Sequence, residues 1–283
     1  MLTIPTIKEL RHHLQKEKEA GKTIGFVPTM GYLHDGHISL VNKAKEETDV
    51  IVMSIFVNPL QFGPTEDLDK YPRDIERDKE LARSAGVTYL FTPSVQEMYP
   101  KPMRTKVVVE QITEVLCGLS RPGHFDGVST VVTKLFNIVQ PDKAFFGQKD
   151  AQQVAVIEQM VEDMLMPVTI VSCPIYREAD GLAMSSRNVY LSDEERSQAL
   201  VLSQSLFVAK QMIDAGERDA SCMIKKVRSI IEEAPLAVID YAEMKKYPEM
   251  ADVDQLVSNE KYVIALAVKF GQTRLIDNSW FQL

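Results

Sequence analysis

The sequence predicts an α/β protein in which a doubly wound parallel sheet is followed by a smaller α+β domain. In the first two-thirds, short apolar runs alternate with helical patterns, an order typical of parallel sheets covered by helices. Nearly continuous apolar runs such as VIVMSIFV indicate strands buried on both faces. The last third instead predicts two helices and a β-hairpin. We therefore expect a Rossmann-like domain over residues 1–175 and an α+β domain over residues 176–283.

The expected elements of the first domain follow from these patterns. The N-terminal segment MLTIPTIKELRHHLQKEKEAGK is expected to form a short amphipathic helix. Strands are expected at Thr23–Val27, Val50–Val57, Thr88–Phe91, Lys106–Val109, Lys143–Phe146 and Thr169–Cys173. Helices are expected at Ile38–Glu47, Asp74–Ser84, Val128–Val139 and Gln152–Leu165.

The second domain is expected to begin with a long helix over Ser192–Gly216. Its Ser-Asp-Glu-Glu start supplies an N-cap and acidic residues in the first turn. A second helix is expected over Ala220–Glu233, followed by the apolar run AVIDYAEM. The run KYVIALAVKF-GQ-TRLIDN predicts a hairpin with Gly271 and Gln272 at the turn.

Composition excludes several classes of protein. The 283 residues are 45% hydrophobic and 25% charged, as in globular proteins with a sizeable core. No apolar run approaches the roughly 20 residues that span a bilayer, and the start lacks a signal core. We therefore expect a cytoplasmic protein that has no membrane partner. The net charge of −8 and the lack of a basic block argue against nucleic acid as a partner.

The segment GFVPTMGYLHDGH, residues 25–37, is the strongest local signal. An expected strand leads through a Gly-containing turn into a helix that starts near His34 to His37. Helix N-termini bind phosphate, and His34 and His37, three residues apart, face the same side of the first turn. A tight turn carrying two surface histidines is the alternative. The position after a strand, where α/β sheets bind ligands, favours the site. Zinc is less attractive because no third ligand stands nearby.

Two further segments follow expected strands. Asn58 and Gln61 come just after the strand that ends at Val57 and offer neutral donors and acceptors for hydroxyls and carboxylates. A Pro/Gly-rich loop that caps its own turns is an equally good interpretation. In PDKAFFGQKDAQQ, Lys149 is placed to reach a phosphate and Asp150 ribose hydroxyls. A solvated Lys–Asp pair at a helix start is the alternative there.

Two loops carry additional cations. In ADGLAMSSRNVYLS, Gly181 and two serines suggest a mobile loop that ends at Arg187 and closes over a triphosphate. Its position favours a domain linker instead. In LSRPGHFDGVSTVV, Arg121 and His124 are candidate cations for a carboxylate or phosphate, and an exposed loop is an equally good interpretation.

The order of the motifs is more informative than any one of them. PTMGYLHDGH, VNPLQFGP, YPRD, RPGHFDGV, FGQKDAQQ and MSSRN follow one another through residues 28–188. In this order they resemble the pantothenate synthetase family, which belongs to the nucleotidyltransferases with HIGH and KMSKS signatures. His34 to His37 occupies the HIGH place and Met184 to Arg187 the KMSKS place. Ser186 and Arg187 replace the usual Lys-Ser tail, a form that counts against a tRNA synthetase.

The resemblance implies a two-step ligation. The carboxylate of pantoate attacks the α-phosphorus of MgATP, which gives pantoyl adenylate and pyrophosphate. The amine of β-alanine then attacks the adenylate, which gives pantothenate and AMP. The resemblance also implies a homodimer, a first domain that binds nucleotide and pantoate, and a second domain that acts as a lid. A cytidylyltransferase and a catalytically silent nucleotide-binding module are the alternatives.

The resemblance carries site residues over by position. The ATP-binding residues would be Met30, Gly31, Tyr32, Leu33, His34, Asp35, Gly36, His37, Gly147, Gln148, Lys149, Asp150, Tyr176, Met184, Ser185, Ser186 and Arg187. Those acting in catalysis would be His34, His37, Lys149, Ser185, Ser186 and Arg187. Gln61 and Gln153 would bind pantoate, beside Asn58 and Met30, and Asp78 would associate with Mg²⁺. The family's His37 position is described as a proton donor, but stabilisation of phosphate charge is its first expected role.

Overall fold

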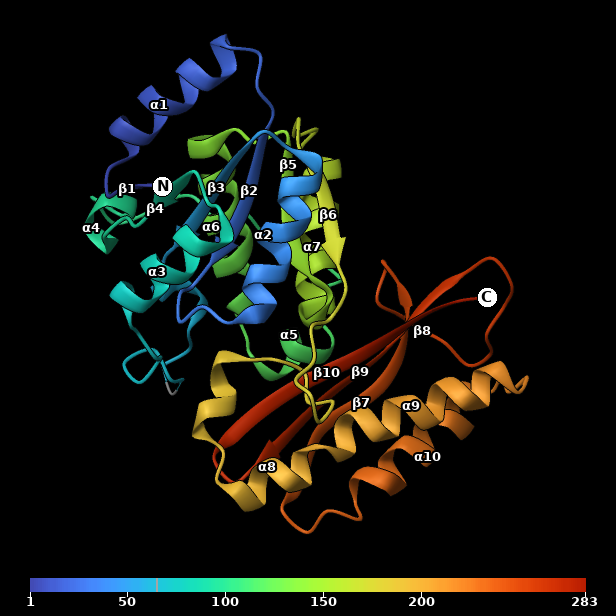
Figure 1. The fold of residues 1–283 in the computed structure, drawn as a ribbon. Coiled ribbons are helices and arrows are strands. Elements are labelled where there is room, and N and C mark those ends of the chain that lie inside the picture. The colour runs from blue at the N-terminus through green and yellow to red at the C-terminus, as the bar shows by residue number, and fades with distance from the viewer. Residues whose placement is uncertain (65) are drawn as a thin grey trace. The chain divides into compact units, whose positions relative to one another are not determined.

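The computed structural model describes residues 1–64 and 66–283, which form two compact units (Figure 1). Unit 1 comprises Met1–Glu110, Arg121–Gly147 and Val156–Pro174. Unit 2 comprises Gln111–Ser120, Gln148–Ala155 and Ile175–Leu283. Unit 2 thus includes two segments that lie within the first 175 residues of the chain. The functional division into a binding domain and a lid at residue 175 stays a prediction.

Unit 1 is built on a parallel sheet whose described strands follow the order β1-β4-β3-β2-β5-β6. From β2 the chain moves through β3 and β4 to one side and through β5 and β6 to the other. The topological switch point therefore lies between β2 and β5, where ligands bind in sheets of this kind. The strands are β1 (Leu2–Ile4), β2 (Ile24–Thr29), β3 (Val50–Ile55), β4 (Tyr89–Phe91), β5 (Lys143–Gly147) and β6 (Thr169–Cys173).

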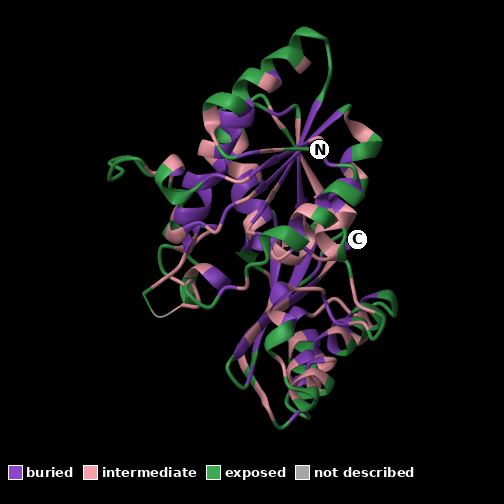
Figure 2. Ribbon diagram, turned by 60° about the vertical axis from the view of Figure 1, so that its left-hand side comes forward, coloured by how far each residue is buried: buried purple, intermediate pink, exposed green. Residues whose placement is uncertain are grey.

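Helices cover both faces of this sheet, which confirms the predicted fold class. Val27 of β2 packs in a buried cluster with Val41 and Ala82, which belong to α2 and α3. The preceding residue, Phe26, points to the other face, where its ring lies 6.4 Å from the ring of Phe136 in α6. This burial on both faces, visible in Figure 2, explains the continuous apolar strands. The helices of unit 1 are α1 (Ile7–Glu19), α2 (Asp35–Glu47), α3 (Ile75–Ala85), α4 (Val95–Met98) and α6 (His124–Val139), with a 3-10 turn η1 (Pro59–Gln61).

Unit 2 consists of an antiparallel sheet, in the order β10-β9-β7-β8, with helices packed on one face (Figure 1). The predicted hairpin is confirmed, because Phe270 pairs with Thr273 across Gly271 and Gln272. The strands are β7 (Ala237–Tyr247), β8 (Ala251–Asp252), β9 (Lys261–Phe270) and β10 (Thr273–Gln282). The other elements are α5 (Leu116–Ser120), η2 (Gln148–Asp150), η3 (Ser186–Tyr190), α8 (Asp193–Ala199), α9 (Val201–Asp214) and α10 (Ala220–Ile231), while α7 (Ala151–Asp163) has residues in both units.

Three predicted elements are wrong in part. Lys106–Val109 is irregular, and Val107 N–H donates to the Thr130 hydroxyl at 3.0 Å instead of to a strand. The N-terminal segment is not all helix, because Leu2–Ile4 forms a strand that pairs with β4. The long helix after Ser192 is divided at Leu200 into α8 and α9. In the described part of the chain, no helix is both long and apolar enough to cross a membrane.

Candidate functional site

The turn between β2 and α2 is shaped by a glycine that cannot be replaced without strain. Gly31 has φ +87°, and Tyr32 after it has φ +52°, both in the left-handed region that favours glycine. A Cβ on Gly31 would lie 2.8 Å from Ile55 Cγ2 and 3.1 Å from Asp78 Oδ2. The backbone of the predicted ATP-binding segment therefore runs close against β3 and α3.

The first turn of α3 holds this segment in place. Asp78, which is 1% exposed, accepts hydrogen bonds from Tyr32 N at 2.8 Å and from Leu33 N at 2.7 Å. Arg77 Nη1 donates to the carbonyl of Leu33 at 2.9 Å, and its guanidinium lies 5.3 Å from the centre of the Tyr32 ring. Charged partners make these hydrogen bonds strong, so α3 fixes the path of the chain into α2.

His34 and His37 meet at the N-terminus of α2, as predicted. His34 is the N-cap, and the centres of the two rings are 4.0 Å apart. His37 Nδ1 accepts a hydrogen bond from the His34 backbone N–H at 3.3 Å. Since Nδ1 is an acceptor, the neutral ring carries its proton on Nε2. His37 therefore offers an N–H donor at the positive end of a helix dipole, an arrangement suited to phosphate oxygens.

The association of Asp78 with Mg²⁺, which the sequence led us to expect, stays a prediction. Both of its oxygens accept backbone N–H groups, and burial raises the pKa of its carboxyl, although these two hydrogen bonds act in the opposite direction. Among the residues that the structure describes, no group of three or more His, Cys, Asp or Glu side chains could hold a metal ion. The contacts of Asp78 give it a structural role in the β2–α2 turn.

Three of the residues expected at the pantoate site lie together in unit 1. Gln61 Nε2 donates to the Met30 sulfur at 3.1 Å, and Asn58 Nδ2 donates to Gln61 Oε1 at 3.1 Å. Asn58 also contacts Tyr99 and Gly127, which the sequence did not single out. Asn58 is 1% exposed and Gln61 8% exposed, so these amides form a buried polar network next to the β2–α2 turn.

Arg121 and His124, the candidate cations of the Pro-Gly loop, have partners within unit 1. The guanidinium of Arg121 makes two hydrogen bonds of 2.7 Å to the Glu66 carboxylate. His124 Nδ1 lies 2.8 Å from the carbonyl of Gln61, and its Nε2 lies 3.1 Å from Arg121 Nη1. Because the carbonyl can only accept and the guanidinium can only donate, His124 is neutral with its proton on Nδ1. In this arrangement the pair supports the Gln61 backbone.

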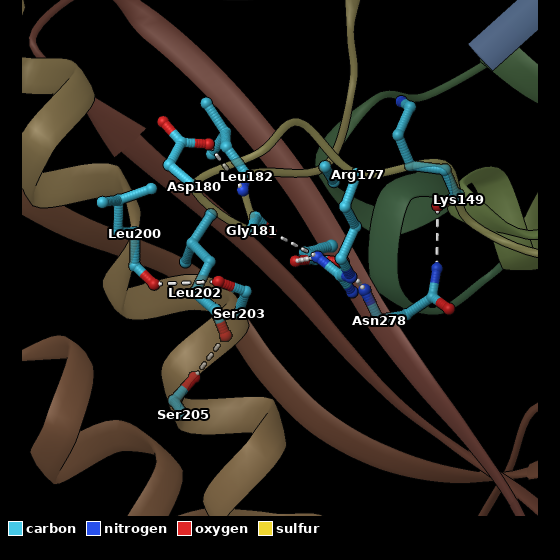
Figure 3. Close-up of polar contacts among 12 residues, drawn as sticks. Lys149, Arg177, Asp180, Gly181, Leu182, Leu200, Leu202, Ser203, Ser205 and Asn278 are labelled. Carbon is cyan, nitrogen blue, oxygen red and sulfur yellow. Dashed lines mark hydrogen bonds and ion pairs between the residues drawn. The ribbon is translucent and has the colours of Figure 1, made fainter. Parts of the chain in front are cut away.

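The Gln-Lys-Asp part of the predicted Gly-Gln-Lys-Asp segment belongs to unit 2, where β10 holds its backbone. Asn278 Nδ2 donates to the carbonyls of Gln148 and Lys149, each at 2.8 Å, as Figure 3 shows for Lys149. Trp280 Nε1 donates to Asn278 Oδ1 at 2.7 Å. The Lys149 ammonium lies 3.4 Å from the Asp150 carboxylate and its side chain is 21% exposed. Asn278 thereby sets the backbone from which the Lys149 side chain extends.

The segment expected to be a mobile loop forms a hairpin in unit 2. Met184 N donates to the Tyr176 carbonyl at 3.0 Å, and Gly181, with φ +94°, forms the turn. Arg177 Nη1 donates to the Gly181 carbonyl at 3.1 Å and to Asp277 at 2.7 Å, as seen in Figure 3 for Gly181. That this segment is mobile and closes over a triphosphate stays a prediction.

Beyond the hairpin, the Met-Ser-Ser-Arg segment starts a short 3-10 helix. Ser185 is its N-cap, and the Ser185 hydroxyl accepts a hydrogen bond from Arg187 N at 3.2 Å. The Asn188 amide donates to Glu178 Oε1 at 2.7 Å and to the carbonyl of Ala183 at 3.1 Å. The hairpin therefore holds the backbone that carries Ser185, Ser186 and Arg187, of which Ser186 is buried.

Asp277 and Asn278 are supporting residues that sequence reasoning missed. Successive side chains of a strand point to opposite faces, so β10 holds the Arg177 side chain on one face and the Gln148–Lys149 backbone on the other. Asp277 is 2% exposed and Asn278 3% exposed. Adjacent Asp and Asn are unfavourable in a strand interior. The pair in TRLIDN was the signal that could have revealed them.

Gln153, the second glutamine expected at the pantoate site, lies in the first turn of α7 and is partly exposed. Its neighbour Gln152 is buried and makes structural hydrogen bonds. Gln152 Oε1 accepts from Cys117 N at 2.9 Å, and its Nε2 donates to the carbonyls of Ile112 and Val115 at 2.8 and 2.7 Å. Gln152 therefore binds the start of α5 and the loop before it, and the role of Gln153 at the pantoate site stays a prediction.

Several known proteins resemble this chain in both sequence and fold. The family described as pantoate-beta-alanine ligase matches residues 2–280. The pantothenate synthetase of Acetivibrio thermocellus is 58% identical over 278 residues, which are 98% of this chain and 98% of the relative. The crystal structure of pantothenate synthetase from Thermus thermophilus has a TM-score of 0.93 and 44% identity, and the match covers 99% of both chains. The structure of a pantoate-beta-alanine ligase from Francisella tularensis, described as complexed with beta-gamma ATP and beta-alanine, has a TM-score of 0.79 and 35% identity and covers 99% of this chain and 97% of that one.

Proposed function

Because the chain belongs to the pantoate–β-alanine ligase family, we propose that its β2–α2 turn holds the triphosphate of ATP while pantoyl adenylate forms. The enzyme is an ATP-dependent ligase that condenses pantoate and β-alanine to pantothenate. The observation that carries the proposal for the turn is the pair of hydrogen bonds from Tyr32 N and Leu33 N to Asp78. They fix the backbone that leads to His34 and His37 before any ligand binds, as electrostatic catalysis requires.

In the first step, an oxygen of the pantoate carboxylate bonds to the α-phosphorus of ATP. The bond from that phosphorus to the bridging oxygen breaks, and pyrophosphate leaves with the bonding electrons. Negative charge grows on the departing oxygens, where His37 donates from Nε2 and the N-terminus of α2 supplies a positive potential. Lys149 and Arg187 supply further positive charge, and the hydroxyls of Ser185 and Ser186 supply hydrogen bonds. The positions of these residues in the family motifs support their roles.

In the second step, the amine of β-alanine attacks the acyl carbon of the adenylate. A C–N bond forms, the bond from carbon to the AMP oxygen breaks, and the nitrogen loses a proton. The remaining residues of the nucleotide site are Met30 to Leu33, Asp35, Gly36, Gly147, Gln148, Asp150, Tyr176 and Met184. Gln61 and Gln153 bind pantoate, with Asn58 and Met30 beside Gln61. The buried contacts among Met30, Asn58 and Gln61 support this assignment for three of these residues.

Mg²⁺ enters as part of the substrate MgATP, and Asp78, which holds the β2–α2 turn, is the carboxylate that would associate with it. When bound, the ion neutralises charge on the phosphates that the protein residues contact. A cytoplasmic location and a homodimer complete the proposal, and light scattering of the purified protein tests the dimer.

Measurement of AMP tests the function directly. We expect AMP to appear from ATP only when both pantoate and β-alanine are present, together with pantothenate in equal amount. A cytidylyltransferase would instead release pyrophosphate from CTP with a single acceptor, and a silent nucleotide-binding module would bind ATP without turnover. Either result would overturn the assignment.

A further inference from the structure

The buried amides around Gln61 form a hydrogen-bonded chain that has a single possible direction. We propose that this chain fixes Gln61 as a hydrogen-bond donor toward pantoate, so that the enzyme selects a substrate oxygen that can accept. Tyr99 and the carbonyl of Gly127 are then positioning groups for substrate selection. The proposal deepens the proposed function, because it assumes that Gln61 contacts pantoate.

The direction of the chain follows from Gly127. Its backbone carbonyl lies 3.1 Å from one end of the Asn58 amide. A carbonyl can only accept a hydrogen bond, so that end must be the NH₂ group. The same NH₂ group lies 3.1 Å from the Gln61 side chain, and the atom that it meets there must be the carbonyl oxygen. The NH₂ group of Gln61 is therefore the end that lies 3.1 Å from the Met30 sulfur.

Tyr99 closes the other end of the chain. Its hydroxyl lies 2.7 Å from Asn58 Oδ1, so it must donate, and Leu60 N donates to the same oxygen at 3.3 Å. Burial raises the pKa of the Tyr99 phenol, which keeps the donating proton in place. The Lys134 ammonium lies 4.8 Å from the centre of the Tyr99 ring. Both ends of the Asn58 amide are thus satisfied, and a flip would place donor against donor and acceptor against acceptor.

A glycine makes this arrangement possible. A Cβ on Gly127 would lie 2.3 Å from the Leu60 carbonyl oxygen and 2.6 Å from Gln61 Cα. Only a glycine therefore lets α6 approach η1 closely enough for its carbonyl to reach Asn58. The segment LSRPGHFDGV contains this glycine, so the segment acts on the pantoate site through its backbone as well as through His124.

The consequence concerns which analogues of pantoate react. A pantoate oxygen that lies beside Met30 meets an N–H of Gln61, so it needs a lone pair but no proton. For the secondary hydroxyl, the 2-oxo acid keeps the accepting oxygen, whereas the 2-deoxy acid leaves a buried N–H unpaired. An unpaired buried donor lowers the rate about 10- to 100-fold. The primary hydroxyl is tested in the same way with the 4-methoxy and 4-deoxy acids.

The experiment measures kcat/KM for each acid in pyrophosphate exchange, in the parent and in Gln61→Ala. The ratio of the kcat/KM values of two acids does not depend on the fraction of enzyme that is folded. The same ratio in Gln61→Ala corrects for the intrinsic reactivity of the acids. We call the 2-oxo and 4-methoxy acids the acceptor-only acids. At one of the two hydroxyl positions, we expect the parent to prefer the acceptor-only acid over the deoxy acid by about 10-fold or more. Gln61→Ala should lose that preference. If Gln61→Ala leaves the use of pantoate unchanged, the assignment of Gln61 to the pantoate site fails. A different result would overturn only the donor inference. In that result the parent uses the acceptor-only acids as poorly as the deoxy acids, while Gln61→Ala discriminates less against both deoxy acids than the parent does.

Two variants test the chain itself. Tyr99→Phe should lower kcat/KM for pantoate about 2- to 10-fold and weaken the preference for the acceptor-only acid, with a smaller change in KM for ATP. Tyr89→Phe is the control, because Tyr89 also donates a hydrogen bond in unit 1, to Glu17 at 2.6 Å, and it should leave the preference unchanged. In Asn58→Asp the carboxylate cannot donate, so Gln61 should turn its NH₂ group inward and the preference should vanish. An unchanged preference in both Tyr99→Phe and Asn58→Asp would overturn the proposal.

Discussion

The carboxylate of Asp78 accepts a hydrogen bond from the backbone N–H of Leu33 at 2.7 Å. The two residues come from α3 and from the turn that precedes α2, and the second oxygen of Asp78 holds Tyr32 in the same way. Helix α3, which follows the YPRD motif, therefore holds the turn that leads to His34 and His37. This relationship makes Asp78 a residue that positions the nucleotide-binding turn.

Asp78→Asn should separate this positioning role from metal binding. The amide can accept only one of the two N–H groups, so the variant leaves a buried donor unpaired and should lose about 1–3 kcal/mol of folding stability. Pyrophosphate exchange should slow because the turn is no longer held, while the Mg²⁺ concentration that gives half-maximal rate stays the same. Asp74→Asn is the control, since Asp74 caps the same helix. A strongly increased Mg²⁺ requirement in Asp78→Asn alone would show that Asp78 also acts as a metal ligand.

Asn278→Asp should disturb the Lys149 backbone without changing the size of the side chain. A carboxylate would face the carbonyls of Gln148 and Lys149, which now accept from Asn278. We expect kcat for adenylate formation to fall about 10- to 100-fold, because misplacement of a catalytic group by about 1 Å has an effect of that size. Asn137→Asp is a matched control that also loses an amide-to-carbonyl hydrogen bond. Single-turnover formation of pantoyl adenylate is the measurement, and equal rates in the two variants would contradict the role of Asn278.

Lys149→Ala and His37→Ala should each remove stabilisation of the transferring phosphates. The expected loss is about 3–4 kcal/mol of barrier, or roughly 10²–10³ in rate. Arg187→Ala should lower kcat and kcat/KM together, because its contact is expected to form as pyrophosphate departs. Lys143→Ala is the control, because Lys143 lies at the start of β5 and pairs with Glu47 at 2.8 Å. Near-normal exchange in Lys149→Ala would contradict a catalytic role for Lys149 and favour a solvated Lys–Asp pair.

The Arg121–Glu66 pair should make stability depend on pH in the acid range. Burial by itself would raise the pKa of Glu66, but the hydrogen bonds and charge of Arg121 outweigh it and lower the pKa from its ordinary value of 4.5. The folded state therefore favours the ionised carboxyl. This stabilisation is fully present above pH 4.5 and is lost as the pH falls through the lowered value. Urea unfolding of the parent and of Glu66→Gln should differ most near neutral pH, and a difference that is constant down to pH 3 would contradict this account.

Local patterns predicted the parts of the fold and site that depend on neighbours in the chain. The apolar runs predicted the central strands, and the spacing of His34 and His37 predicted that their side chains meet at the start of α2. The strand expected at Lys106–Val109 failed because a short run of valines is also compatible with an irregular segment, in which Val108 is 53% exposed. Periodicity reports which side chains have the chance to be buried, and tertiary packing decides whether they are.

The partners of the supporting residues could not be predicted because they lie in distant parts of the chain. Asn278 holds the carbonyl of Gln148, 130 residues earlier, and Gly127 holds Asn58, 69 residues earlier. Single hydrogen bonds of this kind leave no periodic pattern in a sequence. The membership of Gln148–Ala155 in unit 2 likewise has no local signal, since these residues continue directly from β5 into a helix.

Exchange of labelled pyrophosphate into ATP is the most direct test of the central claim, that the chain activates pantoate as an adenylate before β-alanine reacts. The purified enzyme is incubated with MgATP, labelled pyrophosphate and pantoate, with and without β-alanine. We predict that label enters ATP when pantoate is present and β-alanine is absent, and that none enters without pantoate. Exchange that requires β-alanine would contradict the two-step account.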